Sequence, residues 1–98
     1  MGKELVLDIE LYLINNYEFY RPMQSLIKNY ANKLKKGVFD FELAIKGIEN
    51  VVSRYLRSKD FSRYYASDIK LTKEERLYLS GLLLDHYIEE IETKAQGN

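Results

Sequence analysis

Hydrophobic positions recur at intervals of three and four residues along most of the chain, which is the period of an amphipathic α-helix. This pattern predicts four helices, over residues 3–20, 22–36, 41–57 and 73–94. No stretch of useful length alternates between apolar and polar residues, so the sequence predicts no β-sheet. We therefore expect one all-α domain, a small antiparallel helical bundle of about four helices.

The ends of the predicted helices carry residues that typically start or stop a helix. Pro22, the single proline, is expected to end the first helix and begin the second, because the residue before a proline avoids helical angles. Gly37 is expected to end the second helix, and Asp40 to cap the third. Thr72 and Glu75 have the spacing of a capping box, which predicts the start of the fourth helix.

Each predicted helix carries an apolar stripe that we expect to face the core. The third helix has the most regular stripe, and its first member is Phe41. The stripes consist of Leu5, Ile9, Tyr12, Leu13, Tyr17 and Tyr20 in the first helix, Met23, Leu26, Ile27, Tyr30, Ala31 and Leu34 in the second, Phe41, Ala44, Ile45, Ile48, Val51, Val52, Tyr55 and Leu56 in the third, and Leu77, Tyr78, Gly81, Leu84, Tyr87, Ile88 and Ile91 in the fourth.

The helical pattern fails over residues 58–71, which we expect to form a structured loop with at most one short turn of helix. Tyr64 and Tyr65 are adjacent in this segment, so at least one of them is expected at the surface or in an interface. The chain has nine tyrosines, a residue common at binding surfaces. For five others a position at the edge of the core is the simpler interpretation: Tyr12, Tyr20, Tyr30, Tyr55 and Tyr87.

Composition limits the classes of function. With 46% hydrophobic and 31% charged residues, the chain has the composition of a folded domain rather than a disordered tail. The absence of cysteine excludes disulfides, thiolate zinc sites and thiol catalysis. No apolar run approaches the ~20 residues that span a bilayer, and no signal peptide is visible. We therefore expect a cytoplasmic protein with no membrane partner.

Residues with catalytic or metal-binding chemistry are few and isolated. His86 is the one histidine, and although Glu89 shares its helix face, a catalytic metal site usually needs three protein ligands. A solvated acidic helix face is the better interpretation. No serine has an evident base partner, and no glycine-rich phosphate loop occurs. The sequence predicts a non-enzymatic protein without a cofactor, and it indicates no small-molecule substrate.

The charges cancel in sum but not along the chain. Residues 21–63 carry ten basic and four acidic side chains, a net charge of +6, and the two flanks together carry five basic and eleven acidic, a net charge of −6. One hypothesis is a basic patch at the ends of the second and third helices that binds phosphates, with exposed tyrosines stacking on unpaired bases. The alternative is that lysines favour helix C-termini and that the acidic flanks pair with the basic centre inside the bundle. The residues of this patch are Lys33, Lys35, Lys36, Arg54, Arg57, Arg63, Tyr64 and Tyr65.

Residues 10–46 contain five short motifs in a fixed order. A leucine-rich helix that ends at Asn and Tyr is followed by an aliphatic-x-Asn motif, a basic stretch, a Gly-x-aromatic-Asp motif and a Leu-Ala-x-Lys motif. In this order they resemble a family of short helical proteins from bacteriophage and mobile-element genomes, whose function is not known. The resemblance implies a phage-type accessory protein and supplies no activity. Lys28 and Asn29 have no evident structural role and are further candidates for partner contact. The residues that carry the resemblance are Leu11, Tyr12, Asn16, Phe19, Tyr20, Ile27, Lys28, Asn29, Lys33, Lys36, Gly37, Phe39, Asp40, Leu43, Ala44 and Lys46.

Two functional hypotheses follow from the sequence. The first is a non-enzymatic interaction protein that binds a host or phage protein, or a second copy of itself as a homodimer. The second is nucleic-acid binding through the basic centre. Salt separates the two, because a nucleic-acid complex weakens steeply as salt rises.

Overall fold

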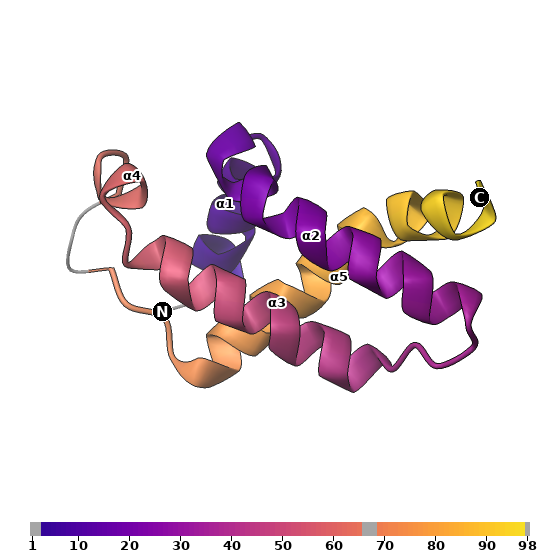
Figure 1. The fold of residues 1–98 in the computed structure, drawn as a ribbon. Coiled ribbons are helices and arrows are strands. Elements are labelled where there is room, and N and C mark those ends of the chain that lie inside the picture. Colours follow the sequence, from indigo (N-terminus) through magenta and orange to yellow (C-terminus); the bar gives the residue numbers. More distant parts are fainter. Residues whose placement is uncertain (1–2, 66–68, 98) are drawn as a thin grey trace.

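The computed structural model describes residues 3–65 and 69–97, and in these ranges it contains five helices and no strand. The helices are α1 (Lys3–Ile14), α2 (Tyr17–Lys35), α3 (Phe41–Leu56), α4 (Lys59–Ser62) and α5 (Lys73–Gln96). In Figure 1, α2 and α3 run antiparallel and α5 crosses behind both of them. The prediction of a small all-α helical bundle is confirmed.

The core lies where α5 meets the other long helices. α5 packs against α1, α2 and α3, and α4 packs against the end of α3. Burial of such large apolar side chains is worth roughly 1.5–3 kcal/mol each relative to exposure, which is what holds these helices together. The largest fully buried side chains are Val6, Ile9, Leu13, Phe19, Met23, Ile27, Ile48, Val52, Leu79, Leu83, Leu84 and Ile91. No helix within residues 3–65 and 69–97 is long and apolar enough to cross a membrane.

The predicted break at Pro22 is wrong, because the chain breaks at Asn16 instead. Asn16 has extended backbone angles, and its side-chain oxygen accepts a hydrogen bond of 2.8 Å from the Glu18 N–H, so it caps α2. Pro22 then lies inside α2, exposed, where it removes one backbone hydrogen bond near the start of the helix. The helix continues through this exposed proline, with Phe19 and Met23 on either side of it fully buried.

The predicted start and stop signals at Gly37, Asp40 and Thr72 are confirmed. Gly37 has a φ of 75°, the left-handed conformation that glycine adopts without strain. Asp40 accepts a hydrogen bond of 3.1 Å from the Leu43 N–H and caps α3. Thr72 and Glu75 form the predicted capping box at the start of α5. Of the four start and stop signals in the sequence, the three at Gly37, Asp40 and Thr72 are thus interpreted correctly, and the one at Pro22 is not.

The predicted inward faces are correct for most positions and wrong for three aromatic ones. Tyr17, Phe41 and Tyr78 are exposed rather than buried. In α5 the predicted stripe also omits Leu79 and Leu83, which are fully buried. Because α5 contacts three helices, its buried surface is wider than a single stripe.

The segment expected to be a structured loop contains one short helix. Ser58 caps α4, and Phe61 within it is buried. Tyr64 is exposed and Tyr65 is half-buried, which confirms that at least one of the two faces outward. Residues 66–68 of this segment lie outside the described residues. α5 continues two residues beyond its predicted end, to Gln96.

Candidate functional site

The candidate basic residues separate into two groups. Because α2 and α3 run antiparallel, their C-terminal ends lie at opposite ends of a molecule that is 42 Å long (Figure 1). We call the C-terminal end of α2, with Lys33, Lys35 and Lys36, the lysine end. We call the C-terminal end of α3 together with α4, with Arg54, Arg57 and Arg63, the arginine end. The structure does not bring the two groups into one patch.

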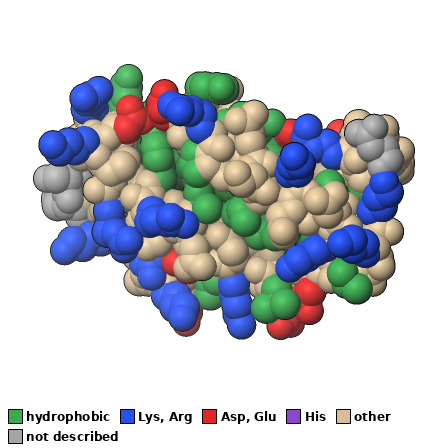
Figure 2. All heavy atoms as spheres, in the orientation of Figure 1, with side chains coloured by type: hydrophobic (Ala, Val, Ile, Leu, Met, Phe, Trp, Pro, Cys, Tyr) green, Lys and Arg blue, Asp and Glu red, His purple; other side chains and the backbone are tan. Residues whose placement is uncertain are grey.

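Among the described residues, these basic side chains are exposed to solvent and form no ion pairs with the acidic flanks. Within residues 3–65 and 69–97 the structure has two ion pairs, Arg21 with Glu18 at 3.5 Å and Arg76 with Glu49 at 2.8 Å. Neither pair includes a candidate residue, and all the candidate lysines and arginines are exposed. Figure 2 shows Lys and Arg side chains gathered at both ends of this face, around a centre with hydrophobic side chains.

At the arginine end, a hydrogen-bonded network connects three parts of the chain. The hydroxyl of Tyr55 donates to the carboxylate of Asp60 and accepts a hydrogen bond of 2.8 Å from the side-chain amide of Asn16. Burial and the bond to Asp60 raise the pKa of Tyr55. The residue that caps α2 is thereby held to α3 and α4.

Beside this network lies an open depression of about 690 Å³, which we call the tyrosine depression. The ring of Tyr12 packs 5.3 Å from that of Tyr64 and 5.5 Å from that of Tyr65, and the Tyr65 hydroxyl donates to the Asp8 carbonyl at 3.4 Å. Among the described residues, Asp8 is the one charged residue that lines the tyrosine depression. The lining residues are Asp8, Leu11, Tyr12, Asn15, Asn16, Tyr17, Tyr64 and Tyr65. Polar groups interrupt the apolar surface of this depression.

The lysine end carries a different kind of surface. Val38, Phe41 and Leu43 are 63%, 58% and 60% exposed, although they are large and apolar. From Phe41 a groove of about 310 Å³ extends between α3 and α5, and its single charged lining residue is Asp85. Phe41 and Leu43 are two residues apart on α3 and point to different sides of it, so Val38 and Leu43 line a small depression toward α2, whereas Phe41 lines the groove toward α5. We call the two neighbouring surfaces together the apolar strip; it consists of Val38, Phe41 and Leu43 and the groove residues Ile45, Leu77, Tyr78 and Leu82. Sequence reasoning missed the strip because it assigned Phe41 and Tyr78 to the core.

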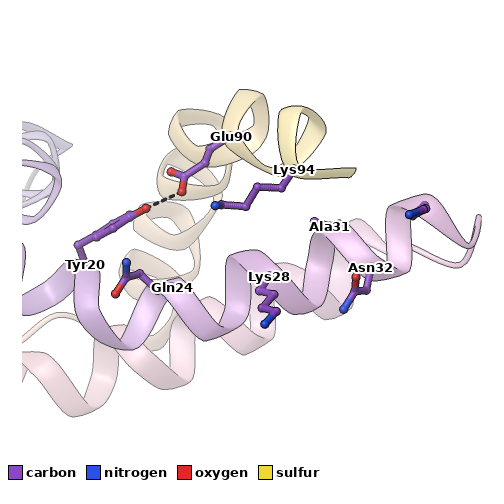
Figure 3. A pocket seen from close by; sticks show the side chains of 8 residues that line it. Tyr20, Gln24, Lys28, Ala31, Asn32, Glu90 and Lys94 are labelled. Carbon is purple, nitrogen blue, oxygen red and sulfur yellow. Dashed lines mark hydrogen bonds between the residues drawn. The ribbon is translucent and has the colours of Figure 1, made fainter. Parts of the chain in front are cut away.

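A third hollow, of about 420 Å³, lies between α2 and the C-terminal half of α5 (Figure 3). The hydroxyl of Tyr20 donates to the carboxylate of Glu90 at 2.5 Å across it. This bond, together with burial, raises the pKa of Tyr20 to about 12. Two candidate residues, Lys28 and Lys35, line the hollow, whereas Asn29 does not. The lining residues are Tyr20, Gln24, Lys28, Ala31, Asn32, Lys35, Glu90 and Lys94.

Groups with metal-binding chemistry do not converge in the described part of the chain. No cluster of three or more His, Cys, Asp or Glu side chains in these residues has the geometry to hold a metal ion. His86 is exposed, and its ring lies edge-on to that of Tyr87 at 4.9 Å. Exposed cations, aromatic rings and apolar side chains make up the surfaces described above.

Comparisons of the chain with models of protein families, with curated proteins and with solved structures find no match. The three surfaces above are thus the basis for a functional assignment.

Proposed function

We propose that the protein is a non-enzymatic interaction protein that binds another protein through the apolar strip. The observation that carries this proposal is the exposure of Val38, Phe41 and Leu43, three large hydrophobic side chains within six residues, each uncovered by more than half. Contiguous apolar patches on folded proteins mark interaction surfaces, because covering them removes hydrocarbon from water.

The local structure does not require these three side chains. Gly37 ends α2 and Asp40 caps α3, so polar residues at positions 38, 41 and 43 would leave the turn intact. The rings of Phe39 and Phe41 pack edge-to-face at 4.9 Å, which orders the strip before a partner arrives. An ordered apolar surface loses little entropy on binding, which favours affinity.

The shape and charge of the strip define the partner. A groove between two helices suits the apolar face of an amphipathic helix. Lys33 lines a small depression with Val38 and Leu43, and Lys36 is exposed nearby in the chain. These cations favour acidic residues beside the apolar face of the partner helix. We propose a host or phage protein as the partner, in line with the resemblance expected from the sequence of residues 10–46.

The test compares two sets of equally exposed side chains. The strip variant carries Val38→Ser, Phe41→Ser and Leu43→Ser, and the control variant carries Leu11→Ser, Tyr17→Ser and Tyr64→Ser at the tyrosine depression. Each tagged protein is expressed in cells that carry the gene, and bound proteins are quantified. We expect a partner retained by the wild-type protein and the control variant but lost from the strip variant. Equal recovery with the strip variant would refute the proposal.

Self-association is a separate outcome of the same design. Light scattering at two concentrations shows whether the wild-type protein forms a dimer and whether the strip variant is monomeric. A dimer that forms only when the apolar strip is intact would show that the partner is a second copy of this chain.

Nucleic-acid binding is a second candidate function, favoured by the arginine end. Arg54, Arg57 and Arg63 are exposed and form no ion pair within the described residues, and the neighbouring Tyr64 is 68% exposed. Such cations neutralise phosphates and such a ring stacks on a base. If three phosphates are engaged, the affinity for a single strand falls by about two powers of ten for each tenfold rise in salt.

Mobility shift with single-stranded DNA and RNA tests this candidate. Replacing Arg54, Arg57 and Arg63 by alanine is expected to abolish binding, whereas replacing Lys33, Lys35 and Lys36 by alanine weakens it less, because the lysine end lies at the other end of the molecule. The absence of any shift at low salt would reject nucleic-acid binding.

A further inference from the structure

Three lysines from two helices line the hollow between α2 and α5, and in Figure 3 the side chain of Lys28 extends from α2 away from Glu90 and Lys94. Lys28 and Lys35 are seven residues apart on α2, and therefore share one face of that helix. Lys94 extends from α5 into the space between the helices (Figure 3). None of the three makes an ion pair within 4.0 Å to a described residue.

The one carboxylate of the hollow is already engaged. Glu90 accepts the hydrogen bond from Tyr20, which fixes its position at one side of the hollow, as the dashed line in Figure 3 shows. Among the described lining residues, three ammonium groups and one carboxylate give a net charge of +2. A ligand that carries two negative charges would neutralise it.

The size and lining of the hollow indicate a small-molecule ligand rather than the flat surface of a macromolecule. A volume of about 420 Å³ lies within the range of roughly 300–1,000 Å³ that small-molecule sites occupy. Ala31 is buried and lines the hollow, and Gln24 and Asn32 supply amide donors and acceptors. The fixed Glu90 carboxylate retains acceptor capacity for hydroxyl groups of a ligand.

We propose that this hollow binds a phosphate monoester of a small hydroxylated molecule, such as a sugar phosphate or a nucleoside monophosphate. The phosphate, with a charge of about −1.5 to −2 at pH 7, lies among the three ammonium groups. Glu90 and the two amides bind the hydroxyl groups. This site lies apart from the apolar strip and does not depend on the function proposed for it.

Calorimetric titration at constant ionic strength tests the site with defined probes: glucose 6-phosphate, adenosine monophosphate, inorganic phosphate, and glucose and adenosine as uncharged counterparts. We expect at least one monoester to bind and its uncharged counterpart not to bind. The double variant Lys28→Met and Lys94→Met keeps the hydrocarbon stems and is expected to weaken binding by about tenfold or more, since it removes two charge-assisted hydrogen bonds to the phosphate.

The matched control carries Lys36→Met and Lys46→Met, two exposed lysines of α2–α3 that do not line the hollow. We expect it to bind within twofold of the wild-type protein. Equal weakening in both double variants would show a general effect of positive charge and overturn the site. The absence of binding by every phosphate probe at 10 mM would also overturn it.

Glu90→Gln separates a binding role for the carboxylate from a purely structural one. Removing its negative charge is expected to strengthen binding of inorganic phosphate several-fold and to weaken the preference for the hydroxylated monoester. Unchanged affinity for both probes would contradict the assigned role. An oligonucleotide that binds more tightly than the monophosphate, with the same dependence on Lys28 and Lys94, would show that the phosphate belongs to nucleic acid and would overturn the small-molecule assignment.

Discussion

The two ends of the α2–α3 pair carry similar charge in very different surroundings. At the lysine end, the cations lie beside uncovered hydrocarbon, with Val38, Phe41 and Leu43 all more than half exposed. At the arginine end they lie beside phenols, amides and carboxylates, many of which are hydrogen-bonded within the molecule. Charge alone therefore does not distinguish the two ends, and the neighbouring groups do.

The neighbouring groups determine what each end gains by binding. Covering apolar surface releases about 25 cal/mol for each Å² removed from water, so the lysine end gains most from a protein partner. The network of Tyr55, Asn16 and Asp60 has satisfied its hydrogen bonds already, so a partner adds little there except through the arginines and the exposed ring of Tyr64. We therefore propose protein binding at the lysine end, with the phosphates of nucleic acid as the candidate ligand of the arginine end.

The largest predicted loss of stability concerns the contact between Tyr30 and α3, which stabilises the lysine end. Tyr30 is buried, and its hydroxyl donates to the Ala44 carbonyl at 2.9 Å, where it fills the space beside Gly47. Gly47→Ala places a methyl group against that hydroxyl, and we expect a loss of about 2 kcal/mol in the free energy of unfolding, the overpacking cost outweighing the helix preference of alanine. Urea denaturation measures it.

A double-mutant cycle isolates the cause of that loss. In a Tyr30→Phe background the hydroxyl is gone, and Gly47→Ala is expected to cost less than about 0.5 kcal/mol. An equal cost in both backgrounds would show that the methyl group conflicts with something other than this hydroxyl.

The next largest predicted loss of stability concerns the hydrogen bonds of Tyr55, which stabilise the arginine end. Tyr55→Phe leaves the Asn16 amide and the Asp60 carboxylate without their shared partner, and we expect a loss of about 1–2 kcal/mol in the free energy of unfolding. Tyr64→Phe, the control, removes a hydroxyl from an exposed ring and is expected to change it by less than about 0.5 kcal/mol. If the two variants lose equal stability, the network does not hold this end together.

Alkaline pH tests the Tyr20–Glu90 contact that lies between the two ends. The pKa of Tyr20 is raised to about 12 in the folded protein, above its ordinary value of 10.0, so the folded state retains a proton that the unfolded state releases. Its contribution to stability is therefore complete below pH 10 and is lost as pH rises toward 12. Tyr20→Phe is expected to reduce the slope of stability against pH in this window by up to about one proton. An unchanged slope would contradict the contact.

The smallest expected change in stability belongs to the strip variant. Its three side chains are exposed, so serine at positions 38, 41 and 43 is expected to alter the free energy of unfolding by less than about 0.5 kcal/mol per site. Urea denaturation measures this, and a large loss would show that the apolar strip serves the fold rather than a partner.

The sequence predicts best what short-range chemistry determines. Asp40 and the pair Thr72 and Glu75 act within one turn of helix, so their spacing alone predicts the helix starts. The apolar stripes predicted over residues 22–36 and 41–57 are correct at every position except Phe41, because each of these helices buries one face. Asn16 was missed since two local preferences compete there, a cap and the nearby Pro22, and their relative strength depends on exposure.

The candidate sites depend on contacts that no local pattern contains. Tyr20 and Glu90 are 70 residues apart in sequence and meet only because α5 crosses α2. Phe41 continues a regular stripe, but it lies beyond the area that α5 covers and becomes a surface residue. The separation of the lysine and arginine ends, in contrast, follows from the antiparallel order that the short connections already predict.

Site-specific photo-crosslinking tests the central claim, that the apolar strip is the protein-binding surface, most directly. A benzophenone amino acid replaces Phe41 in one protein and Tyr64, a similarly exposed ring, in the other, and both are irradiated in cells that carry the gene. We predict a single major protein adduct from position 41 that is absent from position 64. An adduct of the same protein from position 64 alone, or none from position 41, would contradict the account.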